Sequence, residues 1–275
     1  MVFVAEIGIN HNGSIEMAKE LIRVAKQSGA DFVKFQKRDI DLSVPNNTKW
    51  KVKETPWGRM TYYDYRRKLE FGKTQYDMIN AFCMETGIRW TASVWDVNSL
   101  EFILQYDVPY IKVPSACIAN LELLRKIRKA NVPVMMSIGM STIAEIKRAI
   151  GVLGRCDLTI LHCNSSYPAK DSELDLRVIQ TLKRKYPDHK IGYSSHDSGI
   201  YPCLAAAALG AEVIEKHITL DKSLWGTDQK ASLVNEEITE LVSALKKIPV
   251  WLGNNAIRLY ESEKEVRKKL RVENT

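Results

Sequence analysis

Short apolar segments rich in β-branched residues alternate along the chain with longer amphipathic segments. Buried parallel strands show as short apolar runs, whereas surface helices carry apolar residues every three to four positions. The strand pattern fits residues 2–7, 31–36, 88–94, 110–113, 132–137, 157–162, 190–194 and 213–217. Helices are expected over residues 15–27, 73–86, 97–105, 121–129, 143–152, 174–185, 200–209 and 236–247.

Glycines mark the ends of several predicted helices. Gly29, Gly87 and Gly210 each follow an amphipathic run, as glycines at helix C-termini do. Eight strand–helix units in about 250 residues predict an α/β fold, a (β/α)8 or TIM barrel. An open doubly wound sheet is the alternative, but no G-x-G-x-x-G motif follows the first strand. We expect residues 1–253 to form one barrel domain and residues 254–275 a charged helical tail or linker.

The segment 38–72 interrupts the alternation. Its aromatic residues are Trp50, Trp57, Tyr62, Tyr63 and Tyr65. Because it follows a strand, it should lie at the C-terminal face of a barrel, where active sites form. We interpret it as a lid or a dimer contact.

Composition narrows the class of protein. A hydrophobic share of 45% and a charged share of 27% are ordinary for a soluble globular protein. No apolar run approaches the roughly 20 residues that span a bilayer, and the first residues lack the pattern of a signal peptide. The five cysteines form no C-x-x-C pair, which favours free thiols. We therefore expect a cytoplasmic protein that does not bind membranes.

The formal charge of +7 raises the possibility of a nucleic-acid partner. Single-strand binders interleave basic residues with aromatic ones, and no such run is present. The basic segment 264–271 alternates with glutamates, as on a solvated helix face. The positive charge therefore favours binding of a small anionic substrate. We expect no nucleic-acid partner.

Polar residues gather at the predicted C-terminal ends of the strands. Residues two apart in a strand share a face, and this relates Lys34 to Gln36, Ser194 to His196 and Glu215 to His217. Charged groups at such positions are costly to bury unless they are paired or bind a ligand. The set is Glu6, Lys34, Gln36, Ser93, Lys112, Ser115, Ser137, His162, Ser165, Ser194, His196, Glu215 and His217.

Lys34 and Lys112 lie at two separate strand ends. Two ammonium groups together with serine hydroxyls suit the phosphate and the carboxylate of one small molecule. Two alternatives stay open: each lysine pairs with a neighbouring carboxylate, or one of them forms a Schiff base with a carbonyl substrate.

His196 and His217 close consecutive strands, so their imidazoles could converge on one divalent metal ion. Glu215 in register and Asp228 in the following loop support a metal site. The alternative is a pair of hydrogen-bonded core histidines. His11 is either another polar group above the site or an ordinary turn residue.

These residues occur in sequence motifs that resemble those of the sialic acid synthase (N-acetylneuraminate synthase) family. The motifs follow one another in the same order as in the family, and the match runs from residue 2 to about 270. They are 5–13 (AEIGINHNG), 33–36 (VKFQ), 111–115 (IKVPS), 137–142 (SIGMST), 161–163 (LHC), 167–168 (YP), 192–196 (GYSSH), 215–217 (EKH), 226–228 (GTD) and 231–233 (ASL).

The resemblance implies a barrel that binds phosphoenolpyruvate and a divalent metal, usually Mn2+, with Mg2+, Co2+ or Zn2+ as alternatives. It implies that His196 and His217 hold the metal. Phosphoenolpyruvate would be held by Lys34, Ser93, Lys112, Ser115, Ser137, Ser165 and Ser194. The sugar acceptor would face Glu6, Gln36, Tyr167 and Asp228. The catalytic residues would be Glu6, Lys112 and Glu215.

The implied reaction condenses phosphoenolpyruvate with a sugar aldehyde, N-acetylmannosamine or a related hexosamine or its phosphate. The product is a 3-deoxy-2-keto sugar acid such as N-acetylneuraminate, and phosphate is released. The resemblance also implies a homodimer. The alternatives are a related synthase that uses a pentose or tetrose phosphate, a lysine-dependent aldolase, and a non-catalytic barrel that binds a sugar phosphate.

The chain departs from the family in two places. Cys117 stands where the family usually has an acidic residue that is assigned to the cationic intermediate, and a thiol cannot stabilise positive charge in that way. The resemblance also covers the barrel without the small antifreeze-like domain of most members. Residues 262–271 resemble the linker into that domain.

Overall fold

The structure is a computed structural model that describes residues 1–272, and its centre is a closed barrel of parallel strands. The barrel strands are β1 (Val2–Gly8), β2 (Phe32–Lys37), β5 (Arg89–Val94), β6 (Ile111–Val113), β7 (Val134–Ser137), β8 (Leu158–Cys163), β9 (Lys190–Ser195) and β10 (Val213–His217). Their order around the barrel is β1-β10-β9-β8-β7-β6-β5-β2. The predicted TIM barrel is therefore confirmed, and the open doubly wound sheet is not formed.

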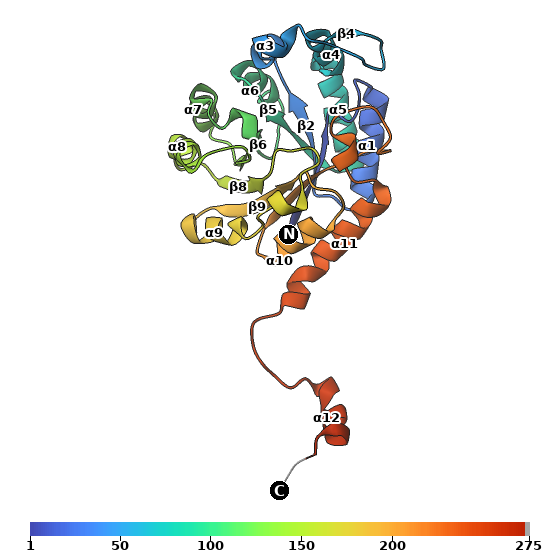
Figure 1. Ribbon diagram of the computed structural model, residues 1–275, viewed down its shortest axis with the longest axis vertical. Coiled ribbons are helices and arrows are strands. Elements are labelled where there is room, and N and C mark those ends of the chain that lie inside the picture. Colours follow the sequence, from blue (N-terminus) through green and yellow to red (C-terminus); the bar gives the residue numbers. More distant parts are fainter. Residues whose placement is uncertain (273–275) are drawn as a thin grey trace.

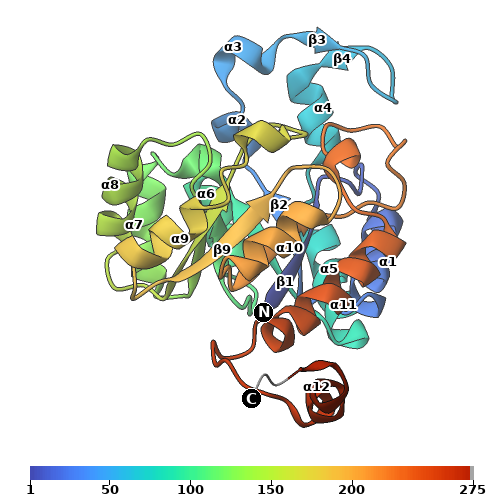
Figure 2. The same cartoon turned by 60° about the horizontal axis from the view of Figure 1, so that its bottom comes forward.

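Helices surround the barrel, as Figures 1 and 2 show. They are α1 (Ile15–Gln27), α5 (Lys73–Thr86), α6 (Val97–Ile103), α7 (Leu121–Ala130), α8 (Ile143–Leu153), α9 (Val178–Lys185), α10 (Tyr201–Ala208) and α11 (Asn235–Leu252). Short 3₁₀ turns are η1 (Ser115–Cys117), η2 (Asp171–Glu173) and η3 (Gln229–Ala231). The glycines expected to end helices do so, with φ angles of 84° at Gly29, 67° at Gly87 and 99° at Gly210.

Two helix boundaries differ from the prediction by more than two residues. The helix expected over 174–185 begins only at Val178, because Asp175 has a φ of 42° and cannot continue a right-handed helix. The helix expected to end at residue 247 continues through Pro249 to Leu252, where its side chains are exposed.

The barrel interior is layered. Its lower layer is apolar and consists of Val4, Tyr110, Met135, Leu161 and Val213. Outside the strands, each helix turns an apolar face inward, so that a continuous core fills the space between the two rings. The packed floor closes the barrel below and leaves its C-terminal end for polar residues.

The segment 38–72 is more ordered than the sequence analysis expected. It contains α2 (Ile40–Ser43), α3 (Asn46–Lys49), α4 (Tyr62–Leu69) and the two-stranded pair of β3 (Val52–Lys53) and β4 (Met60–Thr61). Most of these elements are only two to four residues long. Segments this short show no hydrophobic periodicity by which the sequence could predict them. Tyr65 and Leu69 pack on Ile9 and fix α4 above the barrel (Figure 2). Its role as a lid or dimer contact stays a prediction.

The residues after α11 leave the barrel (Figure 1). They contain η4 (Glu261–Glu263) and α12 (Lys264–Leu270), and residues 253–272 are all exposed. Part of the predicted helical tail 254–275 is therefore helical, and its residues 273–275 lie outside the described residues. Among the described helices, none has the length and apolar character needed to cross a membrane.

Gly192 provides a test of the packed interior. A Cβ at this position would lie 2.5 Å from Leu161 Cδ2 and 2.5 Å from the Val213 carbonyl oxygen. In Gly192→Ala the added methyl group would overpack the barrel interior. The free energy of unfolding should therefore fall by about 3 kcal/mol. The control is Gly151→Ala in α8, where a Cβ meets no atom within 4 Å and should stabilise the helix by about 0.5–1 kcal/mol. Urea denaturation measures both, and equal stability of the two variants would contradict this packing.

Candidate active site

A cavity of about 150 Å³ opens at the C-terminal ends of the barrel strands. Every residue expected to bind a substrate or the metal, or to act in catalysis, lines it, with the exception of Asp228. Those residues are Glu6, Lys34, Gln36, Ser93, Lys112, Ser115, Ser137, Ser165, Tyr167, Ser194, His196, Glu215 and His217. His162, which also belongs to the strand-end set, lies outside the cavity, and its Nε2 is 2.7 Å from the Leu174 carbonyl oxygen. Side chains from all eight strands or the loops that follow them thus meet at one place, as in other barrels with active sites at this face.

Strand register brings the charged residues together. Glu6 on β1 is the register partner of His217 on β10 and of Lys34 on β2. Glu215 on β10 is the register partner of Ser194 on β9. Inward side chains at the same level of a barrel form a layer, so this register produces a layer of polar residues above the apolar floor.

The two lysines share two carboxylates inside this layer. Lys34 Nζ lies 2.6 Å from Glu6 Oε2 and 3.8 Å from Glu215 Oε2. Lys112 Nζ lies 3.5 Å from Glu215 Oε1, and the Ser194 hydroxyl donates to the same oxygen at 3.0 Å. The alternative that each lysine pairs with a neighbouring carboxylate is therefore realised, but within the cavity rather than away from it.

Each lysine is also oriented by a hydroxyl. Lys34 Nζ donates to Ser93 Oγ at 2.7 Å, and Lys112 Nζ donates to Ser137 Oγ at 2.6 Å. An ammonium group has three protons to donate, so these bonds fix its direction and leave capacity for a ligand.

The two carboxyl groups have opposite titration behaviour. Burial raises the pKa of Glu6 to about 7, and the negative charge of Glu215 adds to this although Lys34 opposes it. Burial also disfavours ionisation of Glu215, but Lys112 and Lys34 outweigh it and lower the pKa of Glu215 to about 2. At neutral pH Glu215 is a carboxylate, whereas Glu6 can both release and accept a proton.

Close packing at Gly139 shapes the cavity wall beside Ser115 and Ser165. The Gly139 amide donates to Ser115 Oγ at 3.0 Å. A Cβ at Gly139 would lie 2.4 Å from Ser165 Oγ, so a side chain cannot fit without displacing that hydroxyl. A side chain at position 139 of the sequence SIGMST would therefore disturb a residue that lines the cavity.

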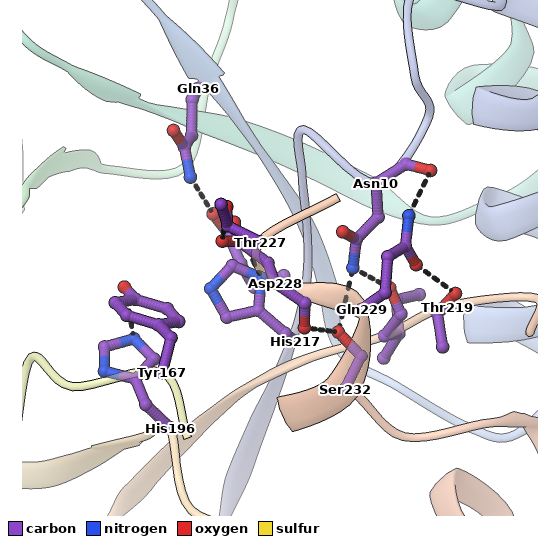
Figure 3. A network of polar contacts seen from close by, with 12 residues as sticks. Asn10, Gln36, Tyr167, His196, His217, Thr219, Thr227, Asp228, Gln229 and Ser232 are labelled. Atoms are coloured by element: carbon purple, nitrogen blue, oxygen red, sulfur yellow. Dashed lines mark hydrogen bonds and ion pairs between the residues drawn. The ribbon is translucent and has the colours of Figure 1, made fainter. Parts of the chain in front are cut away.

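The two imidazoles come from the ends of the neighbouring strands β9 and β10 and lie next to each other, with ring centroids 5.6 Å apart (Figure 3). His196 Nδ1 lies 2.6 Å from the Asn164 carbonyl, which can only accept, so His196 carries its proton there. His196 Nε2 then accepts from the Tyr167 hydroxyl at 2.9 Å. His217 Nδ1 is buried without a hydrogen-bond partner, and Asp228 Oδ2 lies 4.0 Å from it.

These two side chains fit a divalent metal as a two-imidazole site. Burial holds the pKa of His217 well below its usual range, which keeps the ring neutral as a metal ligand must be. Within residues 1–272, no group of three His, Cys, Asp or Glu side chains could hold an ion. The remaining coordination positions would therefore belong to water or substrate oxygens.

Asp228 lies behind the cavity instead of on its wall. Its Oδ1 accepts from the Thr227 hydroxyl at 2.6 Å. Its backbone carbonyl accepts from Ser232 Oγ at 2.7 Å, and Ser232 Oγ in turn accepts from Asn10 Nδ2 at 2.8 Å (Figure 3). This network ties the loop after β10 to the loop after β1, and contact of Asp228 with an acceptor stays a prediction.

Sequence reasoning missed five residues that line the cavity, namely Trp95, Pro114, Ala116, Met140 and Cys163. Alternation could have identified Cys163, because it lies two residues after Leu161 and so faces inward. Its Sγ lies 3.6 Å from His196 Nδ1. The other four lie outside the strands, in loops or in η1, where no alternation exists.

A buried ion pair supports the histidine-bearing strands and was also missed. Lys216 Nζ lies 3.3 Å from Asp197 Oδ2, and both side chains are fully buried. Asp197 Oδ1 accepts from the hydroxyls of Tyr193 at 2.6 Å and Ser195 at 2.7 Å. Lys216 and Asp197 are the chain neighbours of His217 and His196, so this pair fixes the backbone that presents the imidazoles.

Cys117 does not take the place of the missing acid. Its Sγ lies 3.4 Å from the Trp95 carbonyl, to which it donates, and it does not line the cavity. Burial raises the pKa of Cys117 to about 12, so it remains a neutral thiol. These contacts make Cys117 a buried packing residue.

A TIM barrel whose C-terminal cavity combines two lysines, two carboxyl groups and two imidazoles has the form of an enzyme active site for an anionic substrate. The chain belongs to the NeuB family, since the model of that family matches residues 21–256.

Named relatives agree with this assignment. The N-acetylneuraminate-9-phosphate synthase of Drosophila melanogaster is 38% identical over 247 residues, which cover 88% of this chain and 66% of that protein. The N,N'-diacetyllegionaminic acid synthase of Campylobacter jejuni is 36% identical, over 96% of this chain and 81% of that protein. The chain thus spans about two thirds to four fifths of the length of these relatives.

A solved structure extends the similarity to three dimensions. The N-acetylneuraminic acid synthetase of Leptospira borgpetersenii, crystallised with citrate, superimposes with a TM-score of 0.86 at 31% identity. The match covers 98% of this chain and 92% of that one.

The raised pKa of Glu6 gives a prediction for Glu6→Gln. The folded wild type binds the proton of Glu6 more tightly than the unfolded chain does. The resulting stabilisation of the folded state is present below pH 4.5 and is lost as the pH rises through about 7. The free energy of unfolding of Glu6→Gln should therefore rise relative to wild type by about 2–3 kcal/mol between pH 5 and pH 8. Chemical denaturation of the metal-free protein measures this.

Glu215→Gln is the comparison variant, because it keeps the titration of Glu6, shifted to lower pH by the loss of the Glu215 charge. Its free energy of unfolding should still fall as the pH rises from 5, whereas that of Glu6→Gln should not. Parallel pH profiles for the two variants would contradict the different roles assigned to the two carboxyl groups.

Proposed function

We propose that this protein condenses phosphoenolpyruvate with the open-chain aldehyde of a hexosamine of the N-acetylmannosamine type, and releases phosphate. The product is a 3-deoxy-2-keto sugar acid. NeuB membership and relatives named as synthases of such acids support this reaction. Residues 1–253 are proposed as the catalytic domain, and a homodimer in the cytoplasm as the working form.

One observation carries the proposal. Lys34 and Lys112, both 2% exposed, face the same cavity as His196 and His217. Two fixed ammonium groups match the phosphate and carboxylate of phosphoenolpyruvate, and the imidazoles suit a metal ion beside them. Manganese is the metal we propose.

In this proposal the lysines and the histidines have separate roles. Lys34 and Lys112 hold the two anionic ends of phosphoenolpyruvate and orient its carbon 3 toward the aldehyde carbon of the acceptor. A metal ion on His196 and His217 would supply Lewis-acid polarisation of the aldehyde oxygen. The new carbon–carbon bond leaves positive charge at carbon 2, which water captures before phosphate departs.

The carboxyl groups of Glu215 and Glu6 act on the positive charge at carbon 2 and on the attacking water. Glu215 is ionised and lies between the two lysines, so it is the carboxylate available to stabilise the cationic carbon. In this proposal Glu215 stabilises the cationic intermediate, the role that the resemblance assigns to an acidic residue at position 117. Glu6, with its pKa of about 7, accepts the proton that the attacking water loses.

A phosphate-release assay tests the proposal. Purified protein is supplied with phosphoenolpyruvate, Mn2+ and a panel containing N-acetylmannosamine, its 6-phosphate, arabinose 5-phosphate and erythrose 4-phosphate. Release with a hexosamine is expected. Replacing Lys112 by Met should lower kcat/KM by about 1,000-fold, because a charged contact to the substrate is lost.

Release with a pentose or tetrose phosphate instead would contradict the choice of acceptor. Absence of release with every aldehyde would favour a non-catalytic barrel. Borohydride trapping with pyruvate should give no adduct, and an adduct on Lys34 or Lys112 would indicate an aldolase.

Metal binding has a separate test in His217→Ala. This variant should lose stoichiometric Mn2+, measured by elemental analysis after gel filtration, and should keep its circular dichroism spectrum. The control is His189→Ala, which changes a partly exposed histidine at the opposite end of the barrel. Equal Mn2+ content in both variants would show that the assignment of the ligands is wrong.

A further inference from the structure

A fully buried lysine lies on the outer side of strand β10. Lys216 is 0% exposed, and so is Asp197, which belongs to the loop after β9. Alternation along β10 directs Glu215 and His217 into the cavity, so Lys216 points the opposite way, toward the layer of helices. A charged side chain in that layer is costly unless other groups replace its lost hydration.

Every proton of this ammonium group has an acceptor. Lys216 Nζ donates to Ser195 Oγ at 2.7 Å and to the Asp197 carbonyl oxygen, and Asp197 Oδ2 lies 3.3 Å away. The other carboxylate oxygen, Asp197 Oδ1, accepts from the hydroxyls of Tyr193 at 2.6 Å and Ser195 at 2.7 Å. These four residues all lie outside the lining of the cavity, so the network has a role other than contact with a ligand.

The network joins the two strand ends that carry the imidazoles. The register of β9 and β10 ends at the pair of Ser195 and Lys216, so His196 lies one residue beyond the ladder. Among the described residues, hydrogen bonds between Asp197 and β10 come from Lys216 alone. His217 follows Lys216 directly in the chain. One ion pair thus connects the chain neighbours of both imidazoles.

Other backbone bonds tie each histidine to its own loop. The His196 carbonyl oxygen accepts from the amide of Ala169, which follows β8, at 3.0 Å. The His217 carbonyl oxygen accepts from the amide of Leu233, which follows β10, at 2.9 Å. The ion pair is instead a connection from one strand end to the other. It therefore bears directly on the separation of the two rings, whose centroids are 5.6 Å apart.

Stability alone gives little reason for this ion pair. Replacing a buried ion pair by apolar side chains of similar size is often neutral or stabilising, because removing two charges from water offsets their attraction. Apolar side chains cannot, however, hold a carbonyl group in a fixed direction. Loss of a group that orients a metal ligand typically weakens metal binding by about 10- to 100-fold.

We propose that Lys216 and Asp197 are positioning residues, which set the affinity of the two-imidazole site for a divalent metal ion without touching the metal or either substrate. The proposal rests on the proposed function, since it takes the two imidazoles as the metal ligands. It predicts that metal affinity and stability respond differently when both charges are removed together.

A double variant separates positioning from stability. Lys216→Met/Asp197→Leu removes both charges and keeps the interior filled, so its melting temperature should stay within about 4 °C of the wild type. The Kd for Mn2+ should nevertheless rise by about 10- to 100-fold. It is measured on the metal-free protein, by electron paramagnetic resonance of unbound Mn2+. A Kd equal to that of the wild type would overturn the proposal.

Asp197→Asn tests the same connection with little change of volume. Its Kd for Mn2+ should rise by about 10-fold, and an unchanged Kd would overturn the proposal even where the double variant does not fold. The matched control is Lys37→Met, which breaks the ion pair of Lys37 with Glu70 at 2.7 Å. This control should lower the melting temperature and keep the wild-type Kd. An equal rise of Kd in the control would overturn the proposal, because loss of stability would then explain it.

His217→Ala and the phosphate-release assay separate failure of this proposal from failure of the proposed function. Mn2+ binding that depends on His217 but not on the ion pair would overturn the positioning role and leave the ligands as assigned. Binding that depends on both, in a protein that releases no phosphate with any aldehyde, would support the positioning role and overturn the reaction. Binding that depends on neither would overturn the ligand assignment and the positioning role together.

Discussion

The burial of two ammonium groups at the top of an apolar barrel is the constraint on which the rest of the site depends. A buried lysine is tolerated only when charge and hydrogen bonds compensate its lost hydration. Glu215 compensates both lysines, and Ser93 and Ser137 direct them. With Glu6 protonated, one positive charge remains in excess. This layer of polar residues is therefore suited to bind an anion.

This excess charge also explains the division of the cavity. The lysines lie deep, next to the apolar floor, and the imidazoles of His196 and His217 occupy the adjacent wall. In the proposed reaction, phosphoenolpyruvate on the lysines and the acceptor aldehyde beside the imidazoles would have their reacting carbons between them.

Much of this arrangement could be predicted because a parallel barrel obeys simple periodic rules. Alternation placed Lys34 with Gln36 and Glu215 with His217 on the inner face, and the closed barrel brought the strand ends together. The same rule applied to β8 would have found Cys163. The resemblance to a known family added Tyr167, which lies in a loop without periodic pattern.

The remaining features depend on contacts between segments that no local pattern encodes. Arg38 and Glu70 become neighbours only because the end of α4 returns to the residue after β2, where the Arg38 amide donates to Glu70 Oε1 at 3.0 Å. The pair of Lys216 and Asp197 looked like ordinary polar residues beside the histidines. The late start of α9 depends on the backbone of Asp175, a residue type that often occurs within predicted helices. In each case the tertiary structure, and not the local sequence, decided the outcome.

A crystal structure with phosphoenolpyruvate and Mn2+ tests the central claim most directly. The account predicts phosphate and carboxylate oxygens within hydrogen-bond distance of Lys34 and Lys112, and an ion bound to His196 and His217. Phosphoenolpyruvate bound elsewhere, with both lysines still held only by Glu6 and Glu215, would contradict it.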